Sequence, residues 1–305
     1  MNMNISGKII FALVTATCIA LAPQASAQTD DSEELKIVAL EALISAPPER
    51  ALPLAVKALQ GDHSDAVKSR ALFVLSQIEL PEAQNLVMET ARQGSGETQV
   101  EAIRMVGIAG DVVALSQLVE VYESGDEGVR RAVLEAYVIA DDEDAVYDLA
   151  IRVSNAGNED EFESAVEILG AMGAREHLRK LRESTGISKT LIEAYAISGD
   201  ADSLRELALD DSDPDMQTQA IEALGIVGGS EVNATLVEIY RSSDSEDVRE
   251  SALEGMLISG HDEGVLELYR SSQDPAEKRE LLEWLVMMGS DEVWDIIDSA
   301  LDGGF

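Results

Sequence analysis

A nine-residue pattern of apolar, small and polar positions recurs along this chain. In the copy AIEALGIVG, Ala220, Ile221 and Leu224 fall at about 0°, about 100° and about 40° on a helical projection and form one apolar face. The second position is Leu, Ile or Val in every copy, and the fifth is always Leu, Val, Met or Tyr. The nine copies, called the phrase below, begin at residues 39, 71, 102, 133, 165, 191, 220, 252 and 281. The pattern predicts nine amphipathic helices.

Each phrase helix is expected to have a defined end and a partner helix. Six copies end on a glycine that can close a helix in the left-handed conformation, namely Gly110, Gly173, Gly199, Gly228, Gly260 and Gly289. Pro47 and Asp141 fill this slot in copies one and four, and Pro81 follows the slot in copy two. Asp160, Asp215 and Asp247 are predicted to cap the helix starts. A second amphipathic run follows each phrase, with Leu236 and Leu266 as expected core residues.

The copies follow one another at a period of roughly 30 residues, and self-similarity at such a period is typical of stacked helix pairs. We therefore predict an all-α protein, a right-handed α-solenoid (α-α superhelix) of about nine stacked helix pairs. One domain spans 31–305, and 28–30 form a loose tail. The 26-residue step between copies five and six, the shortest in the series, predicts an irregular stack around 182–188.

Two short segments resemble a known repeat family. Glu127-Gly128-Val129-Arg130-Arg131-Ala132 and Asp247-Val248-Arg249-Glu250-Ser251-Ala252 each place an acidic turn and a Val-Arg pair before the alanine-rich helix. This form resembles the short HEAT-like repeat of phycobilin lyase-type proteins. The resemblance implies an array that binds another protein, with partners docked more often on the second helix of each pair. It also implies an alternative function, a lyase or another enzyme accessory.

The first residues predict export. Lys8 precedes an apolar stretch over 9–22, and Ala25-Ser26-Ala27 then supplies small residues for cleavage. We expect residues 1–27 to be a signal peptide cleaved after Ala27, and the protein to be periplasmic or secreted. Cleavage removes Cys18, the single cysteine, so disulfides and thiolate chemistry are not expected in the mature chain. No later segment predicts membrane insertion.

The net charge of the chain limits the classes of partner that it can bind. The chain has 22 basic and 59 acidic residues, a formal net charge of −37. Such a surface repels phosphate backbones and anionic lipid, so nucleic acid is not expected as a partner. Two interpretations stay open: recognition of a basic protein, or a general surface adaptation to salty surroundings.

The most regular polar feature is glutamate at the third phrase position, which lies at about 200° and faces away from the core. The candidate partner-binding residues are Glu135, Glu167, Glu193, Glu222, Glu254 and Glu283, with Glu41 in the same position of copy one. Phe73 and Arg104 interrupt the row. Isoleucine at the seventh position, at about 240°, keeps the acidic stripe narrow, as at Ile197, Ile226 and Ile258. The stripe is either a ladder for a basic partner or a solvated helix face.

Other candidate chemistry is weak. Asp211, Asp213, Asp215 and Glu222 have the order of a calcium loop, but Met216 stands where that loop needs glycine. His63, His177 and His261 are dispersed, which disfavours a zinc site. Trp284 and Trp294 are expected to seal the last repeat; the alternative is an anchor for a partner. We predict a non-catalytic scaffold with no catalytic residue, cofactor or metal; a carboxylate-rich cation binder is the remaining alternative.

Overall fold

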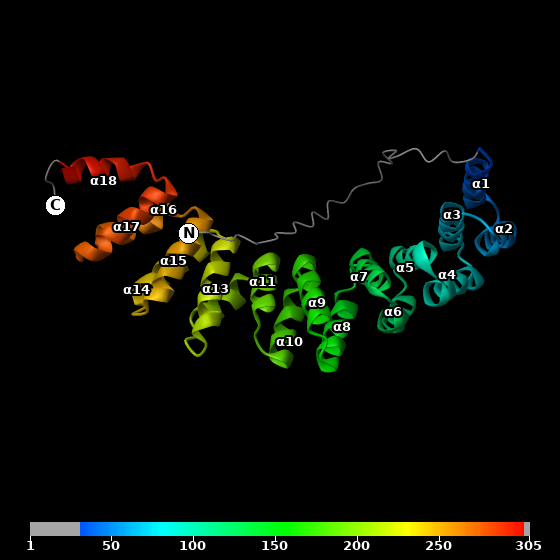
Figure 1. Cartoon of the computed structure of the whole chain (residues 1–305), viewed down its shortest axis with the longest axis horizontal. Coiled ribbons are helices and arrows are strands. Elements are labelled where there is room, and N and C mark those ends of the chain that lie inside the picture. The colour runs from blue at the N-terminus through cyan, green and yellow to red at the C-terminus, as the bar shows by residue number, and fades with distance from the viewer. Residues whose placement is uncertain (1–30, 302–305) are drawn as a thin grey trace.

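The computed structural model describes residues 31–301, and within them every α-helix belongs to one of nine consecutive helix pairs (Figure 1). The predicted signal peptide and the tail at 28–30 lie outside the described residues. The phrase helices are α1 (Asp31–Ala42), α3 (Asp65–Ser76), α5 (Gly96–Ala109), α7 (Glu127–Ile139), α9 (Glu159–Met172), α11 (Lys189–Ser198), α13 (Pro214–Val227), α15 (Glu246–Ser259) and α17 (Pro275–Met288). The second helices are α2 (Pro48–Gln60), α4 (Pro81–Gln93), α6 (Val112–Ser124), α8 (Glu143–Ala156), α10 (Arg175–Thr185), α12 (Ala201–Ala208), α14 (Ser230–Ser242), α16 (Asp262–Ser271) and α18 (Glu292–Leu301). A 3-10 turn, Leu43–Ser45, follows α1. The predicted all-α solenoid is confirmed.

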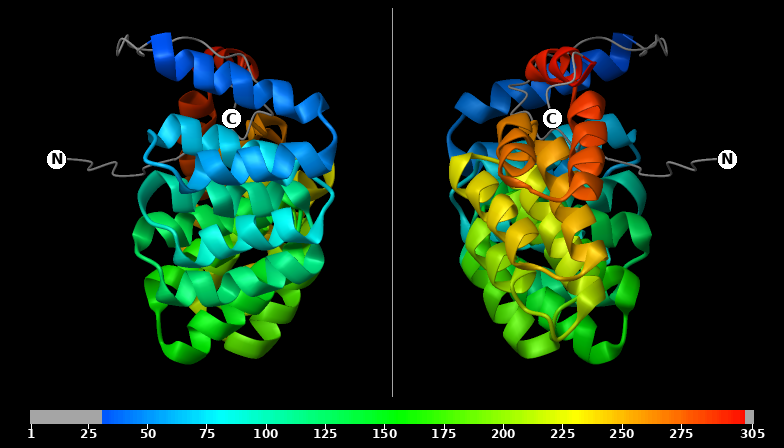
Figure 2. Two further views of the ribbon diagram at one scale, coloured as in Figure 1. Left: turned by 90° about the vertical axis from the view of Figure 1, so that its right-hand side faces the viewer. Right: turned by 90° about the vertical axis from the view of Figure 1, so that its left-hand side faces the viewer.

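The helix pairs stack into a curved array with two layers. In Figure 1 the array forms an arc, with α7, α9 and α11 toward its inner, concave side and α6, α8 and α10 toward its outer, convex side. Seen from either end, the helices run across the long axis of the array (Figure 2). Neighbouring phrase helices contact one another more extensively in most repeats than neighbouring second helices do, as expected for the shorter, inner side of an arc.

The predicted left-handed helix ends are confirmed for five glycines, whereas Gly228, with φ 66° and ψ −166°, ends α13 outside the left-handed region; the predicted caps are wrong. All six phrase-ending glycines have positive φ, and Asp141 fills the same slot at φ 55°. The helix caps, however, lie two residues before the predicted ones. Asp213 and Ser245 accept the capping N–H bonds of α13 and α15, and Asn158 occupies the N-cap position of α9. Asp160, Asp215 and Asp247 lie instead in the first helical turn, where a carboxylate is favoured by the helix dipole.

The apolar core runs continuously between the two layers. Leu236 and Leu266 are buried in it, as predicted, and the largest fully buried side chains are Tyr137 and Tyr195. At the last repeat the expectation is met only in part. Trp284 packs against the core, whereas the side chain of Trp294 is 66% exposed and does not seal the stack.

Glycine at the sixth phrase position brings phrase helices close together. A Cβ added to Gly107 would lie 2.7 Å from Cα of Ala136 on the next phrase helix, and one added to Gly225 would lie 2.5 Å from the backbone oxygen of Gly255. Gly170 approaches Ala194 in the same way, at 3.0 Å. The sixth position of one phrase therefore packs against the fourth position of the next.

From α3 onward, larger residues at the sixth position accompany looser packing of the same helices. Ser76 and Ala196 accompany intermediate packing of α3 on α5 and of α11 on α13. Where Val138 or Leu257 takes the position, α7 barely contacts α9 and α15 barely contacts α17. The inner layer thus consists of blocks of contacting helices: one is α1, α3, α5 and α7, and another is α9, α11, α13 and α15, within which α11 and α13 pack less closely than the other neighbours.

The 26-residue step is absorbed by short helices. Helix α10 continues regularly to Thr185, and Gly186, with φ 85°, begins the connection to α11. The shortening comes from α10, which has 11 residues, and from α11, which has 10 and begins at Lys189, just before copy six starts at Leu191. The irregularity predicted at 182–188 is therefore only a tight connection after α10.

Candidate functional site

The third and seventh phrase positions form the concave surface of the array. Positions one, two and five are buried toward the second helices, and positions four and six face the neighbouring phrase helices. On a helical projection the fourth position lies at about 300° and the sixth at about 140°, so the remaining face is centred at about 220°. The third position, at about 200°, and the seventh, at about 240°, stand on either side of that centre.

The structure places the predicted glutamates in this surface. Each occupies the same position on a successive phrase helix, so α7, α9, α11, α13, α15 and α17 each present one carboxylate. Glu222 and Glu254 are half-buried, and the others are exposed, namely Glu41, Glu135, Glu167, Glu193 and Glu283. Exposure is expected for a solvated face and for a partner-binding face alike. The two interpretations differ in whether the carboxylates have basic side chains as ion-pair partners.

Arginines neutralise the N-terminal part of the stripe. Arg70 lies 3.3 Å from Glu41, and Arg104 and Arg131 each lie 3.8 Å from Glu135. Arg104 is itself a third-position residue, so the interruption seen in the sequence places a counter-ion inside the row. Arg70 also lies over the ring of Phe73, the other interruption, at 5.5 Å from the ring centroid. Glu41 and Glu135 are thus already paired.

The C-terminal part of the stripe has no such partners. Among the described residues, no Lys, Arg or His nitrogen lies within 4.0 Å of the carboxylates of Glu167, Glu193, Glu222, Glu254 or Glu283. Burial raises the pKa of Glu254, and the negative charges of Glu222 and Glu250 raise it further. The unpaired acids on α13 and α15 therefore repel each other across the closely packed pair of helices.

Replacing Glu254 with glutamine is expected to raise the free energy of unfolding at pH 7 by about 0.2–0.5 kcal/mol, the size found for neighbouring like charges. A carboxyl whose folded pKa is raised destabilises the protein while it is ionised. The gain should therefore be present at pH 7 and vanish below its unfolded pKa of about 4.3. Urea denaturation of both proteins on either side of that value measures this. A gain that persists in acid would show that it does not come from ionisation.

An exposed row of isoleucines lies beside the unpaired acids. Ile197, Ile226 and Ile258 are 60%, 65% and 53% exposed, each one helical turn beyond the glutamate of its own helix. Sequence reasoning placed these residues at the margin of the stripe but gave them no role. The available signal was an isoleucine at an outward angle in five copies, three of them consecutive. We call Glu193, Ile197, Glu222, Ile226, Glu254 and Ile258 the Glu–Ile ladder.

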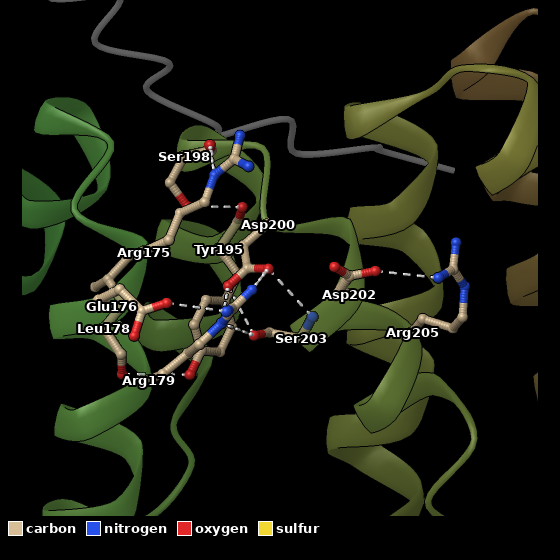
Figure 3. A network of polar contacts seen from close by, with 10 residues as sticks. All are labelled: Arg175, Glu176, Leu178, Arg179, Tyr195, Ser198, Asp200, Asp202, Ser203 and Arg205. Carbon is tan, nitrogen blue, oxygen red and sulfur yellow. Dashed lines mark hydrogen bonds and ion pairs between the residues drawn. The ribbon is translucent and has the colours of Figure 1, made fainter.

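A buried ion pair joins the second helices across the shortest repeat (Figure 3). Asp200, 1% exposed, accepts bonds from Arg179 Nε at 2.8 Å and Nη2 at 2.6 Å, and from the Ser203 hydroxyl at 2.7 Å. Its carboxylate also caps α12 by accepting from the Ser203 N–H. Arg175 Nε, in the first turn of α10, donates to the carbonyl of Ser198 at the end of α11. These contacts hold α10, α11 and α12 together. Sequence reasoning missed them.

A polar cleft of about 510 Å³ opens beside this pair, between α10 and α12. Its lining residues are Arg179, Arg182, Glu183, Tyr195, Asp202, Ser203 and Glu206. Burial raises the pKa of Tyr195 to about 12, and its hydroxyl donates to the carbonyl of Leu178. Burial alone would raise the pKa of Asp200, but bonds from Arg179 and Ser203 bring it below its ordinary value. The Tyr195 hydroxyl and the Asp200 carboxylate both bind other groups of the fold, so these two groups hold neighbouring helices together.

Two of the remaining candidates, Asp213 and His177, have structural roles. Asp213 caps α13, so the calcium-like series does not form a loop. His177 joins α10 to the start of α8 through Glu143 and Asp144, at 3.1 and 2.9 Å. Within residues 31–301 no group of three or more His, Cys, Asp or Glu side chains is arranged to hold a metal ion. In the same range no helix combines the length and apolar character needed to cross a membrane.

Comparisons with known proteins agree with the repeat architecture. Residues 198–256 match the HEAT repeats family, and no curated protein matches the chain. The structure of human deoxyhypusine hydroxylase in complex with glycerol is similar at 18% identity, over 89% of this chain and 92% of that chain, with a TM-score of 0.33. A structure from the computational design of self-assembling cyclic protein homooligomers is similar at 14% identity, over 90% and 100%, with a TM-score of 0.14. At these TM-scores neither structural similarity bears on function.

Proposed function

We propose that this chain, a HEAT-like repeat protein, is an exported, non-catalytic scaffold that binds another protein through its concave, acidic surface. The observation that carries the proposal is the set of unpaired carboxylates on α9, α11, α13 and α15. Surface carboxylates are commonly offset by nearby Lys or Arg, as Glu41 and Glu135 are here. Carboxylates left unpaired on the inner side of an arc can instead be neutralised by a basic partner.

The scaffold would act by multivalent recognition. Each phrase helix contributes one weak contact, and the array holds these contacts at fixed spacing, so no helix has to order itself on binding. Long-range attraction would speed the encounter and fall with ionic strength. The export part of the proposal rests on the charged and apolar pattern of 1–27, and the partner class rests on the surface charge.

Crosslinked capture from an envelope extract tests the scaffold. Wild type is expected to capture a reproducible partner, and raising sodium chloride from about 50 mM to about 200 mM should weaken capture severalfold. A variant with Glu167, Glu193, Glu222 and Glu254 changed to Gln should lose at least about tenfold in capture, since each unpaired charge contributes. The matched control changes Glu41 and Glu135 to Gln, where arginines already neutralise the charge, and should leave capture unchanged. Recovery of nothing, or equal loss in both variants, would contradict the proposal.

A further inference from the structure

Building on this proposed scaffold, we propose that the Glu–Ile ladder binds an extended, basic polypeptide segment. The segment has an apolar side chain at every third residue and a Lys or Arg beside each. The apolar side chains would pack against Ile197, Ile226 and Ile258. The cations would meet the carboxylates of Glu193, Glu222 and Glu254.

The isoleucine row provides the first argument. Single exposed apolar residues are ordinary on protein surfaces, but a contiguous series marks a contact surface. Here three isoleucines occupy equivalent positions on consecutive phrase helices, each more than half exposed. A solvated face would not need an isoleucine at this angle, because polar residues such as Glu, Gln and Lys have an equal or higher helix propensity. The row therefore fits a partner that covers it.

The charges provide the second argument. Each helix of the ladder presents an acid four residues before its isoleucine, and residues so spaced lie on the same helix face. The carboxylates have no basic partner within 4.0 Å in the described part of the chain, and the pKa of Glu254 is raised by burial and by Glu222 and Glu250. A cation placed between the acids of adjacent helices would relieve that repulsion. A partner that complements the ladder would therefore present alternating apolar and basic side chains.

The spacing of the helices selects an extended segment. Helices packed through glycine and alanine approach to about 8–9 Å, the lower part of the usual range. The contact of Gly225 with Gly255 between α13 and α15 is of this kind, and α11 and α13 have the buried alanines Ala196 and Ala223 at the corresponding positions. A polyproline-type strand advances about 9.3 Å in three residues, which is one full turn. Every third side chain of the strand therefore meets an equivalent position on the next phrase helix. A helical partner advances about 10.5 Å per seven residues and drifts out of register on the inner side of an arc.

The probe is a synthetic peptide of four Lys-Ile-Pro triplets, in which proline favours the extended form and places all isoleucines along one edge. Binding to the full chain is measured by calorimetry or fluorescence anisotropy at about 20 mM and about 500 mM salt. Wild type is expected to bind with a one-to-one stoichiometry, and more weakly at high salt. Changing the three ladder isoleucines to Ser should weaken binding by about 30-fold, equal to about 2 kcal/mol. Changing the three ladder glutamates to Gln should weaken it about tenfold and reduce its salt dependence.

Matched controls lie on the other block of the inner layer. Ile108 and Ile139 occupy the same phrase position on α5 and α7 and are 51% and 47% exposed. Because arginines neutralise the acids beside them, changing both to Ser should leave binding within twofold. A Lys-Ser-Pro peptide and a Glu-Ile-Pro peptide should not bind. The substituted isoleucines are exposed, whereas Glu222 and Glu254 are half-buried, so far-ultraviolet circular dichroism checks that each variant keeps its helices.

Three results would overturn the inference. The first is equal binding by the ladder variants and wild type. The second is tighter binding of a helical peptide with the same Lys and Ile content. The third is self-association of the protein, seen by sedimentation, that the Ile→Ser variant abolishes, because the ladder would then hold a second copy. If partner capture requires the glutamates but not the isoleucines, the ladder proposal is rejected and the scaffold proposal is retained. If the wild-type protein neither binds the peptide nor captures any partner, both the ladder proposal and the scaffold proposal are rejected.

Discussion

Replacing Arg179 with methionine is expected to lower the local opening free energy of α10, α11 and α12 by about 3 kcal/mol at pH 7. Methionine keeps much of the packing of the arginine stem but removes both charge-assisted bonds to Asp200. The carboxylate of Asp200 is 1% exposed, so it would remain buried with only Ser203 as a partner. The loss should lie near the lower end of values for broken buried pairs, because the Arg179 side chain is 40% exposed and water screens it.

The pH dependence of this variant identifies the cause. In wild type the folded pKa of Asp200 is below its ordinary value, so its stabilising contribution is present above about pH 3.9 and is lost as the pH falls through the folded pKa. Without Arg179, burial dominates and the folded pKa is expected to rise above the ordinary value. The variant is then destabilised at neutral pH and relieved on acidification. The difference between the two proteins should shrink from pH 7 toward pH 3.

Amide hydrogen exchange measures the effect locally, which matters because a solenoid need not unfold in one step. The control is Arg182→Met on the same helix, which removes an ion pair to Glu206, a residue that is 70% exposed. That change should cost less than about 1 kcal/mol. A second variant, Arg179→Met with Asp200→Asn, removes the buried charge and should recover part of the loss. Equal exchange in the two single variants, or a loss that does not depend on pH, would count against a buried carboxylate as the cause.

The fold followed from the sequence because each phrase is locally consistent. The apolar face repeats in all nine copies and the closing glycine in six, so tertiary packing reinforced each local prediction. Ile221 and Leu224 are fully buried, as their angles predict, and Gly228 ends its helix. The caps were misplaced because the segments before the phrase helices offer several cap-competent residues. The run from Asp211 to Asp215 contains four, and periodicity cannot choose among them.

The site was predicted only in part, because pairing across repeats leaves no local pattern. The exposure of the third-position glutamates followed from the helical angle. Their division into paired and unpaired groups did not, because Arg70 and Arg104 reach carboxylates on the neighbouring phrase helices, a full repeat away in the sequence. Asp200 likewise reads as an ordinary helix cap, and only the packing of α10 beside α12 brings Arg179 to it. Residues that face each other across a repeat boundary therefore need the structure.

Replacing Gly225 with leucine is expected to lower the local opening free energy of α13 and α15 by about 3 kcal/mol. A Cβ at this position would lie 2.5 Å from the backbone oxygen of Gly255 and 2.6 Å from its Cα. Backbone cannot rotate away as a side chain can, so the two helices must separate. Even alanine, which gains about 1 kcal/mol in helix propensity over glycine, should be destabilising here. Hydrogen exchange should show the loss in α13 and α15 and leave α3 and α5 unchanged.

The matched control is Val138→Leu, at the same phrase position on α7, where the next phrase helix already stands apart. It adds one methylene group where the next phrase helix stands apart, so it should cost less than about 1.5 kcal/mol, the lower part of the range for added methylenes. Separation of α13 from α15 also moves Glu222 and Ile226 away from Glu254 and Ile258. The Gly225→Leu variant should therefore bind the Lys-Ile-Pro peptide more weakly, although no residue of the ladder is changed. Unchanged peptide affinity with clear loss of exchange protection would mean that helix spacing does not set the register of the ladder.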